Sequence, residues 1–304
     1  MNFLWYDLET YGIDPKRDRI VQFAAIRTDE ELNLIGDECS IFSDIPDDYL
    51  PDPQACLVHG LTPSNLAENQ LRECDFAERI SQIMCQPGTC AVGFNNNYFD
   101  DEFVRFLFYR NLLDPYSWHW REGNSRWDIL NLARTISALR PNSIKVKTTD
   151  TGYSFKLQDL ATINQVDSGN AHDALSDVKT TLELARIFKK KANNIFCNSY
   201  KIRGKAAASE FIKSHRLLPT IFTSRYIPTS LKSTSVIVPI CRHPSYADRY
   251  IAIDLRHDYS ALLNNSSEEI KKIMFSDNGG MPYPQHKPRL HVVKLNSCPS
   301  LYDL

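Results

Sequence analysis

Apolar residues open the chain in runs that have the alternation and β-branched content of strands. Those runs are residues 3–10 (FLWYDLET), 20–29 (IVQFAAIRTD), 37–45 (DECSIFSDI) and, further on, 90–95 (CAVGFN). Later segments repeat their apolar residues at the helical interval, so we predict helices over 74–85, 98–113, 127–139, 157–165 and 172–191. Strands first and helices interleaved afterwards predict an α/β fold with a mixed sheet covered by helices.

The pattern changes after about residue 193. Residues 233–258 (STSVIVPICRHPSYADRYIAIDLRHD) are two apolar runs around a turn rich in Pro, Ser and Asp, which predicts a β-hairpin. RLHVVKLN at 289–296 has the character of another strand. We therefore predict two domains, 1–192 and 193–304, of which the second is small and β-rich.

Composition indicates the class of protein and its cellular compartment. The 304 residues are 42% hydrophobic and 24% charged, which is typical of a globular protein, and no run approaches the roughly 18 apolar residues of a membrane span. We expect no secretory signal, because the first residues already form a strand. The eight cysteines are scattered without a CxxC pair, which favours reduced thiols in the cytoplasm over a disulfide framework or a zinc site.

Charge is unevenly distributed along the chain. Residues 1–60 hold 13 acidic and 4 basic side chains, whereas residues 179–216 hold 10 basic and 2 acidic ones. Such a chain can bind a cation at one place and a polyanion at another, although ordinary solvated helix faces are the alternative.

Two acids stand inside the first apolar run. A strand sends residues i and i+2 to the same face, so Asp7 and Glu9 should point the same way, about 6 to 7 Å apart. Two carboxylates held that close in a partly dry site repel unless a cation compensates them. The alternative is a strand that emerges into solvent at Asp7.

Further candidates follow along the chain. Asp100 opens a predicted helix just after a predicted strand, where an acid is also an ordinary helix-start residue. Asp177 lies at the edge of the apolar stripe of the helix predicted over 172–191, so it can face a cleft. A spacing of five residues keeps His172 off that helical face and places it on the preceding loop.

Taken in order, D-x-E, N-x-x-x-F-D and H-x-x-x-x-D resemble the DEDDh family of 3′-to-5′ exonucleases, which have an RNase H-like fold. The segments QFAAIRTD, DDYLPDP, HGLTP, FYRNLLDPYSW, NSRWDIL and SGNAHDALSDV are similar to the exonuclease I branch, bacterial enzymes specific for single-stranded DNA. The resemblance implies that an SH3-like domain follows the catalytic domain. It also implies a helical C-terminal domain, before which this sequence ends.

The resemblance implies a site as well. Asp7, Glu9, Asp100 and Asp177 would hold two Mg²⁺ ions, for which Mn²⁺ can substitute, and four carboxylates suit two hard cations. His172 would accept a proton from the attacking water, a task that an imidazole can perform at neutral pH. The products would be 5′-mononucleotides. As partners we expect single-stranded DNA and single-strand DNA-binding protein, with the enzyme a monomer that serves DNA repair and recombination.

A segment rich in aromatic residues predicts the DNA contacts. Residues 103–128 hold three of the four tryptophans, interleaved with arginines, and such a mixture suits bases and phosphates. A helix core is the alternative, which we prefer for the phenylalanines at 103, 106 and 108. By resemblance, the substrate contacts are Glu9, Arg105, Tyr116, Trp120, Arg134 and Lys156. Lys156 stands where the family has an arginine, which changes a bidentate phosphate contact to a point charge.

Three other functions fit parts of this pattern: a DEDDh exonuclease acting on short RNA, a proofreading subunit, and a nucleic-acid-binding protein without catalysis. The aromatic segment and the added β-rich domain argue against the first two. The five catalytic-type residues argue against the third.

Overall fold

The computed structural model of the chain describes residues 2–63, 65–66, 69–169, 172–275 and 289–304. Its contacts form two compact units, Met1–Tyr200 and Lys201–Leu304. The domain boundary that the sequence predicts, between residues 192 and 193, remains a prediction. Helix α7 (Asn193–Lys201) begins at that point of the chain.

The first unit is built on a five-stranded mixed sheet, which confirms the predicted architecture. The strand order is β3-β2-β1-β4-β5; β1 runs antiparallel to β2 and parallel to β4. The strands are β1 (Asn2–Thr10), β2 (Ile20–Thr28), β3 (Cys39–Phe42), β4 (Thr89–Gly93) and β5 (Ser125–Asp128). The sequence pattern missed β5, because its residues lead directly into a helix that was predicted to begin at 127.

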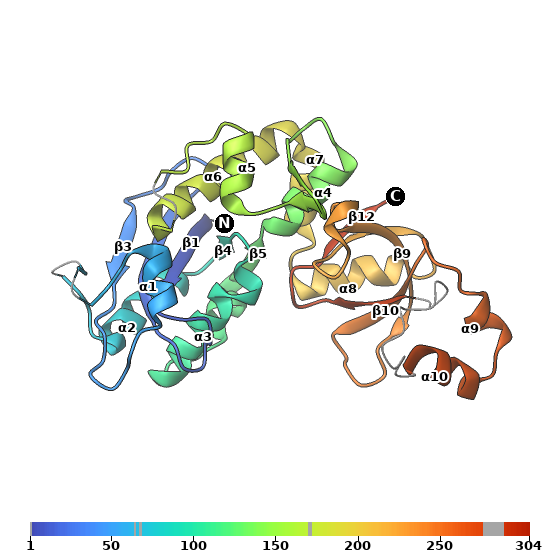
Figure 1. The fold of residues 1–304 in the computed structure, drawn as a ribbon, viewed down its shortest axis with the longest axis horizontal. Helices are drawn as coiled ribbons and strands as arrows, with labels where there is room; N and C mark the ends of the chain where they lie inside the picture. The colour runs from blue at the N-terminus through green and yellow to red at the C-terminus, as the bar shows by residue number, and fades with distance from the viewer. Residues whose placement is uncertain (1, 64, 67–68, 170–171, 276–288) are drawn as a thin grey trace. The chain divides into compact units, whose positions relative to one another are not determined.

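Helices cover both faces of this sheet, and Figure 1 shows α6 on one side with α2 and α3 on the other. The five predicted helices are confirmed with small shifts at their ends. The helices of this unit, besides α7, are α1 (Pro53–His59), α2 (Glu73–Met84), α3 (Asp100–Arg110), α4 (Leu130–Leu139), α5 (Leu157–Ile163) and α6 (Ala174–Lys191), and a small hairpin joins β6 (Lys147–Thr149) to β7 (Gly152–Ser154). The pattern missed α1, which is capped by the Asp52 side chain and opens on a proline.

Side chains along β1 point alternately to the two faces of the sheet. Leu4, Tyr6 and Leu8 are buried in one cluster with residues of α2 and α3. Phe3 points to the other face, where its ring lies 5.8 Å from that of Trp5 and 6.1 Å from that of Trp127. The same alternation sends the side chains of residues 7 and 9 to this second face.

None of the helices in the described ranges combines the length and the hydropathy that a bilayer span requires. The longest of those helices, α6, has 18 residues, and its last turn holds three lysines.

The second unit contains an antiparallel sheet of order β11-β10-β9-β8-β12. Its strands are β8 (Thr220–Thr223), β9 (Thr234–Arg242), β10 (Arg249–Asp254), β11 (Leu290–Lys294) and β12 (Ser300–Asp303), so the predicted hairpin and the predicted late strand are both confirmed. Helix α8 (Lys205–Ser214) packs Ala208 and Ile212 into the core of this unit. Two more helices, α9 (Ser260–Asn264) and α10 (Ser267–Phe275), follow β10.

Asp254, at the end of β10, is completely buried in the second unit. Its carboxylate accepts hydrogen bonds from Ser235 Oγ (2.7 Å) and Arg256 Nε (2.9 Å), and it lies 3.0 Å from His291 Nε2. These partners hold the pKa of Asp254 below its usual value, although burial acts in the opposite direction. The network joins β9, β10 and β11, so it is part of what stabilises the sheet.

Candidate active site

The end of β1 carries two carboxylates on one face of the sheet. In the β1–β2 ladder Asp7 pairs with Ala24 and Glu9 with Gln22, and neither neighbour is a cation. Burial, followed by the charge of Asp177, raises the pKa of Glu9 to about 8. Burial also raises the pKa of Asp7 well above its usual value, and Asp100 is the next largest cause. The two acids therefore resist ionisation in the absence of a positive charge.

Asp100 reaches the same place from the next strand. It is the first residue of α3, which follows β4 after a short 3₁₀ turn (Asn96–Tyr98), and it is buried. Burial, with a further contribution from Asp101, raises the pKa of Asp100 well above its usual value. The chain can make this turn because β4 ends in Gly93: a Cβ there would lie 2.8 Å from Asn96 Cβ.

Asp101, the next residue, is buried, and three side chains donate hydrogen bonds to its carboxylate. Its carboxylate accepts hydrogen bonds from Tyr6 Oη, from Asn96 Nδ2 (3.1 Å) and from Arg126 (2.6 Å). Tyr6 adjoins Asp7 and Asp101 adjoins Asp100, so this network ties together the two elements that carry the first and third acids.

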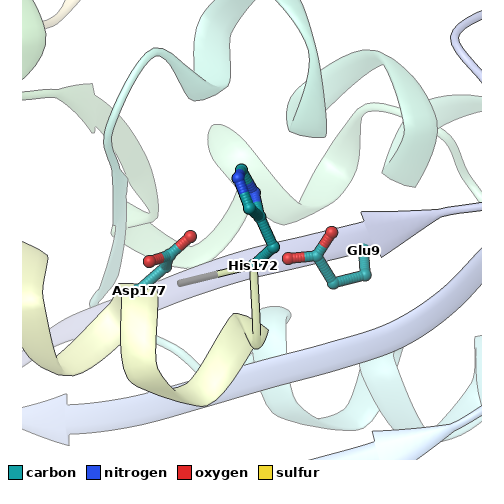
Figure 2. Close-up of side chains that lie close together, drawn as sticks. All are labelled: Glu9, His172 and Asp177. Atoms are coloured by element: carbon teal, nitrogen blue, oxygen red, sulfur yellow. The ribbon is translucent and has the colours of Figure 1, made fainter. Parts of the chain in front are cut away.

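Helix α6 and the loop before it supply the last two residues of the candidate site. His172 lies on the preceding loop in a left-handed conformation, with φ at 64°, and Asp177 lies one turn into the helix. One ligand atom from each of Glu9, His172 and Asp177 falls within 4.8 Å of the others, as Figure 2 shows for the three side chains. Gln158 of α5 donates a 3.2 Å hydrogen bond to Asp177. Burial nevertheless raises the pKa of Asp177 to about 6.

These residues fit a divalent metal ion. Glu9 and Asp177 are largely buried carboxylates whose pKa values are raised mainly by burial, and His172 adds an exposed imidazole beside them. Carboxylate oxygens with one imidazole are ligands that such cations accept. A bound cation would reverse the pKa shifts of these acids, because it favours their ionised forms.

Three of the predicted substrate residues lie on α3 and the loop after it. The Arg105 guanidinium lies 5.9 Å from the ring centre of Tyr116 and pairs with Glu102. Tyr116 is 51% exposed and Trp120 is 59% exposed. Asp114 fixes this loop by accepting a 2.9 Å hydrogen bond from the Tyr116 main-chain N–H. Two aromatic faces and one cation are thus available to a ligand.

Besides Glu9 on β1, the remaining two predicted contacts lie on α4 and at the start of α5. The Arg134 guanidinium stands 5.7 Å from the ring centre of Phe155 and donates to Asn131. Lys156 follows Phe155 in the sequence, precedes the first residue of α5 and is exposed.

Part of the aromatic segment belongs to the core, as we preferred for its phenylalanines; burial confirms this for Phe103 and Phe108, and it extends to two tryptophans. Trp118 and Trp127 are each 1% exposed, and so is Phe103, while Phe108 is fully buried. Phe106 is only half-buried, beneath the Arg105 guanidinium. Arg126 is occupied by Asp101.

The basic run at 179–216 is partly neutralised by the acidic N-terminal part of the chain. Lys179 pairs with Glu38 at 2.7 Å, and Lys189 pairs with Glu31 at the same distance. Charges that are separated along the sequence therefore meet in the fold, and these lysines help to seat α6 on the β2–β3 region.

Sequence reasoning missed four polar residues around the acids: Gln22, Asp101, Asp128 and Gln158. Asp128, at the end of β5, is buried and accepts main-chain hydrogen bonds from Asn95 (2.9 Å) and Leu130 (3.0 Å). Burial raises its pKa to about 6. A polar residue inside an apolar run was the available signal for Gln22 and Asp128, and it is the same signal that identified Asp7 and Glu9.

Comparison with known proteins gives two family matches. The model described as exonuclease matches residues 4–185, and the model described as exonuclease I SH3-like domain matches residues 203–304. Among curated proteins, exodeoxyribonuclease I of Buchnera aphidicola (Acyrthosiphon pisum) is 44% identical over 275 residues, which are 90% of this chain and 66% of that protein.

Comparison with solved structures also gives matches to exonuclease I. Escherichia coli exonuclease I in complex with a dA16 oligonucleotide matches with a TM-score of 0.90 and 36% identity, over 99% of this chain and 64% of that one. A zinc-bound complex of the E. coli protein with single-stranded DNA also matches, and so does a complex named ExoI/SSB-Ct. The chain thus spans slightly less than two thirds of the length of these relatives.

Proposed function

Since the chain belongs to the exonuclease family, whose model matches residues 4–185, we propose that it degrades single-stranded DNA from the 3′ end and releases 5′-mononucleotides. The observation that carries the proposal is the pair of carboxylates at the end of β1, Asp7 and Glu9, whose pKa values burial and neighbouring acids raise, joined by His172 and Asp177 within 4.8 Å of Glu9. A phosphodiester hydrolase needs such a concentration of oxygen ligands next to a base.

Asp7, Glu9, Asp100 and Asp177 hold the metal in this proposal, as two Mg²⁺ ions that Mn²⁺ can replace. When bound, the ions supply a nucleophilic hydroxide from water and neutralise charge on the leaving 3′-oxygen. The carboxylates contribute ionised oxygens from three elements, β1, α3 and α6. Tyr6 and Asn96 hold Asp101, and Asp101 in turn fixes the start of α3, where Asp100 lies.

His172 acts as the general base. It is exposed on a loop, so its ring can turn to the water that attacks the phosphorus atom and take that water's proton. Its main chain is held next to Asp177, whose carboxylate accepts a hydrogen bond from the His172 N–H.

Arg105, Tyr116, Trp120, Arg134 and Lys156 bind the strand, together with Glu9 at its 3′ end. The exposed rings offer stacking surfaces to bases, and the cations face phosphates. Trp120→Ala should weaken oligonucleotide binding by about 1–3 kcal/mol without changing its salt slope, whereas Arg105→Ala should make the slope shallower. Fluorescence titrations at several salt concentrations measure both; normal binding by Trp120→Ala would remove Trp120 from the interface.

The proposal also covers the domains, the oligomeric state, the cellular location and the partners of the protein. We place the exonuclease activity in residues 1–192 and an SH3-like domain in residues 193–304, in a monomeric cytoplasmic protein. The relative named in the ExoI/SSB-Ct complex makes single-strand DNA-binding protein the expected partner. DNA repair and recombination are the processes that supply single strands with free 3′ ends.

The decisive experiment uses one oligonucleotide sequence, labelled at the 3′ or the 5′ end. Single-stranded DNA, duplex DNA and RNA are incubated with the protein in Mg²⁺, in Mn²⁺ and in EDTA. We expect immediate release of the 3′ label as mononucleotide from single-stranded DNA alone, and no release in EDTA. Faster attack on short RNA would instead favour the alternative, which a weaker match supports: oligoribonuclease of Legionella pneumophila is 27% identical over 126 residues.

A further inference from the structure

Gln22 is a polar residue in β2, a strand that is buried at eight of its nine positions. It is the third residue of β2, is 1% exposed, and faces Glu9 across the β1–β2 ladder. A buried amide needs partners for both its oxygen and its nitrogen, because an unsatisfied group there costs stability. What those partners are decides what Gln22 does.

Both ends of the Gln22 amide engage the start of α6. Its Oε1 accepts a 3.2 Å hydrogen bond from the main-chain N–H of Ala174, the first residue of that helix. Its Nε2 donates a 2.9 Å hydrogen bond to Oδ1 of Asp173 and a 3.2 Å one to Ser40 Oγ of the neighbouring strand β3. Asp173 caps α6, since its other oxygen accepts a 3.1 Å hydrogen bond from the Ser176 N–H. One side chain of β2 therefore holds both the capping residue and one of the N–H groups that a helix leaves unpaired at its start.

The held segment is the one that completes the candidate active site. His172 precedes Asp173 by one residue, and Asp177 follows within the first turn of α6. Glu9, the third member of the cluster, lies directly opposite Gln22 in the sheet. The amide thus fixes the distance between the strand that carries Glu9 and the helix start that carries the other two groups.

We propose that Gln22 is a positioning residue, which sets the geometry of the Glu9–His172–Asp177 cluster by clamping the first turn of α6 onto β2. Its influence on turnover rests on the proposed nuclease function. Its influence on the geometry and on metal binding does not, so the two can be tested separately. Gln158 has a different task, because it contacts the Asp177 carboxylate and not the helix start.

The first test needs no substitution. The first N–H groups of a helix usually exchange rapidly with solvent, because they have no partner within the helix. The clamp predicts that the Ala174 N–H is protected in the metal-free wild-type protein, as measured by amide hydrogen exchange with NMR detection. Exchange of Ala174 at the rate of an unprotected amide would overturn the proposal.

The second test removes the amide but keeps its length. Gln22→Met should speed exchange at Ala174 and Ser176 and weaken Mn²⁺ binding by about 10- to 100-fold, the usual effect of losing a group that orients a metal ligand. Turnover should fall mainly through kcat, with a much smaller change in KM for DNA, because Glu9 is the one proposed DNA contact that belongs to this cluster.

The matched control is Thr28→Val, at the far end of the same strand. It removes the buried hydrogen bond from Trp5 Nε1 to Thr28 Oγ1 (2.9 Å), which joins β1 to β2 and does not involve α6. This variant should lose stability while it keeps wild-type Mn²⁺ affinity and α6 exchange. If Gln22→Met binds Mn²⁺ as tightly as Thr28→Val does, Gln22 only stabilises the fold and the proposal is wrong. A wild-type protein that shows the protected Ala174 and the Mn²⁺ effect but no nuclease activity would sink the proposed function and leave the clamp standing.

Discussion

Asp254 in the second unit and Glu9 in the first are both buried carboxylates, yet their surroundings act on them in opposite directions. Asp254 receives hydrogen bonds from Ser235 and Arg256 and lies against His291, and its pKa is lowered. Glu9 faces other acids, and its pKa rises to about 8. Burial alone therefore does not mark a functional acid; the absence of a compensating donor does.

The same contrast occurs between adjacent residues of α3. Asp101 is satisfied by Tyr6, Asn96 and Arg126, whereas the pKa of Asp100 is raised by burial and by its acidic neighbours. A satisfied buried carboxylate is a structural element, and an uncompensated one is a binding site for a cation. Four experiments can break or sharpen this distinction.

The largest effect is expected from Asp7→Asn. Loss of one uncompensated carboxylate should reduce Mg²⁺-dependent cleavage by roughly 10⁴-fold or more, as removal of essential catalytic groups does. The metal-free variant should unfold at higher denaturant concentration than wild type, because a repulsive charge is gone. Asp75→Asn, on the exposed face of α2, is the control and should leave cleavage unchanged. Turnover by Asp7→Asn within tenfold of wild type would refute the metal site.

His172→Ala should reduce the rate by roughly two to four orders of magnitude, the usual contribution of a positioned base. Oligonucleotide affinity should persist, since the proposed strand contacts lie elsewhere. Single-turnover kinetics and anisotropy titrations separate the two quantities. An equal loss of binding would make His172 a ligand contact, not a base.

Asp254→Asn tests the other side of the comparison. It leaves Arg256 and His291 without their partner and should lower the free energy of unfolding by about 3 kcal/mol, as breaking a buried ion pair does. Nuclease turnover at a temperature where the protein is folded should not change. Urea unfolding measures the first quantity; Asp248→Asn, a partly exposed acid, should change it by less than about 1 kcal/mol. A stable Asp254→Asn variant would show that the network contributes no stability.

The smallest effect, and the one that compares both regions in a single titration, is the dependence of stability on pH. Glu9 has a raised pKa in the folded state, so the metal-free protein binds more protons folded than unfolded between about pH 4.5 and 8. Stability of the first unit should therefore fall as pH rises through that window. Asp254 has a lowered pKa, so its contribution is present above about pH 4 and is lost in stronger acid.

Saturating Mg²⁺ should abolish the decline between pH 4.5 and 8 and leave the acid limb unchanged. Urea unfolding followed at residues of each unit by NMR resolves the two limbs. A metal-free first unit whose stability rises with pH over that range would contradict the uncompensated state of Glu9.

Local pattern predicted much of this molecule. Alternation along β1 placed Asp7 and Glu9 on one face, and helical spacing placed His172 before α6 and Asp177 within it. The mixed sheet and the β-rich second unit followed from the order of apolar runs. These features depend on residues close together in the chain, which is why the sequence revealed them.

The local sequence pattern did not predict which side chains that lie far apart in the sequence pair in the fold. Arg126 was expected to face phosphate, but it pairs with Asp101, and the basic run of α6 is partly occupied by Glu31 and Glu38. Trp118 and Trp127 lie in the core because the elements around them close over their rings. Charge and aromatic content say what a residue can bind, whereas the fold decides which partner reaches it first.

The hydrogen bond from Gln22 to Asp173 joins residues 151 positions apart, and this separation has a consequence for protein synthesis. At about 5 to 20 residues per second, a ribosome makes Asp173 roughly 8 to 30 s after Gln22. The hairpin of β1 and β2 can pair during that interval, but the helix that completes the acid cluster does not yet exist. A nascent chain should therefore be unable to cleave DNA until most of its first unit has been translated, so the order of synthesis itself delays the onset of the proposed nuclease activity.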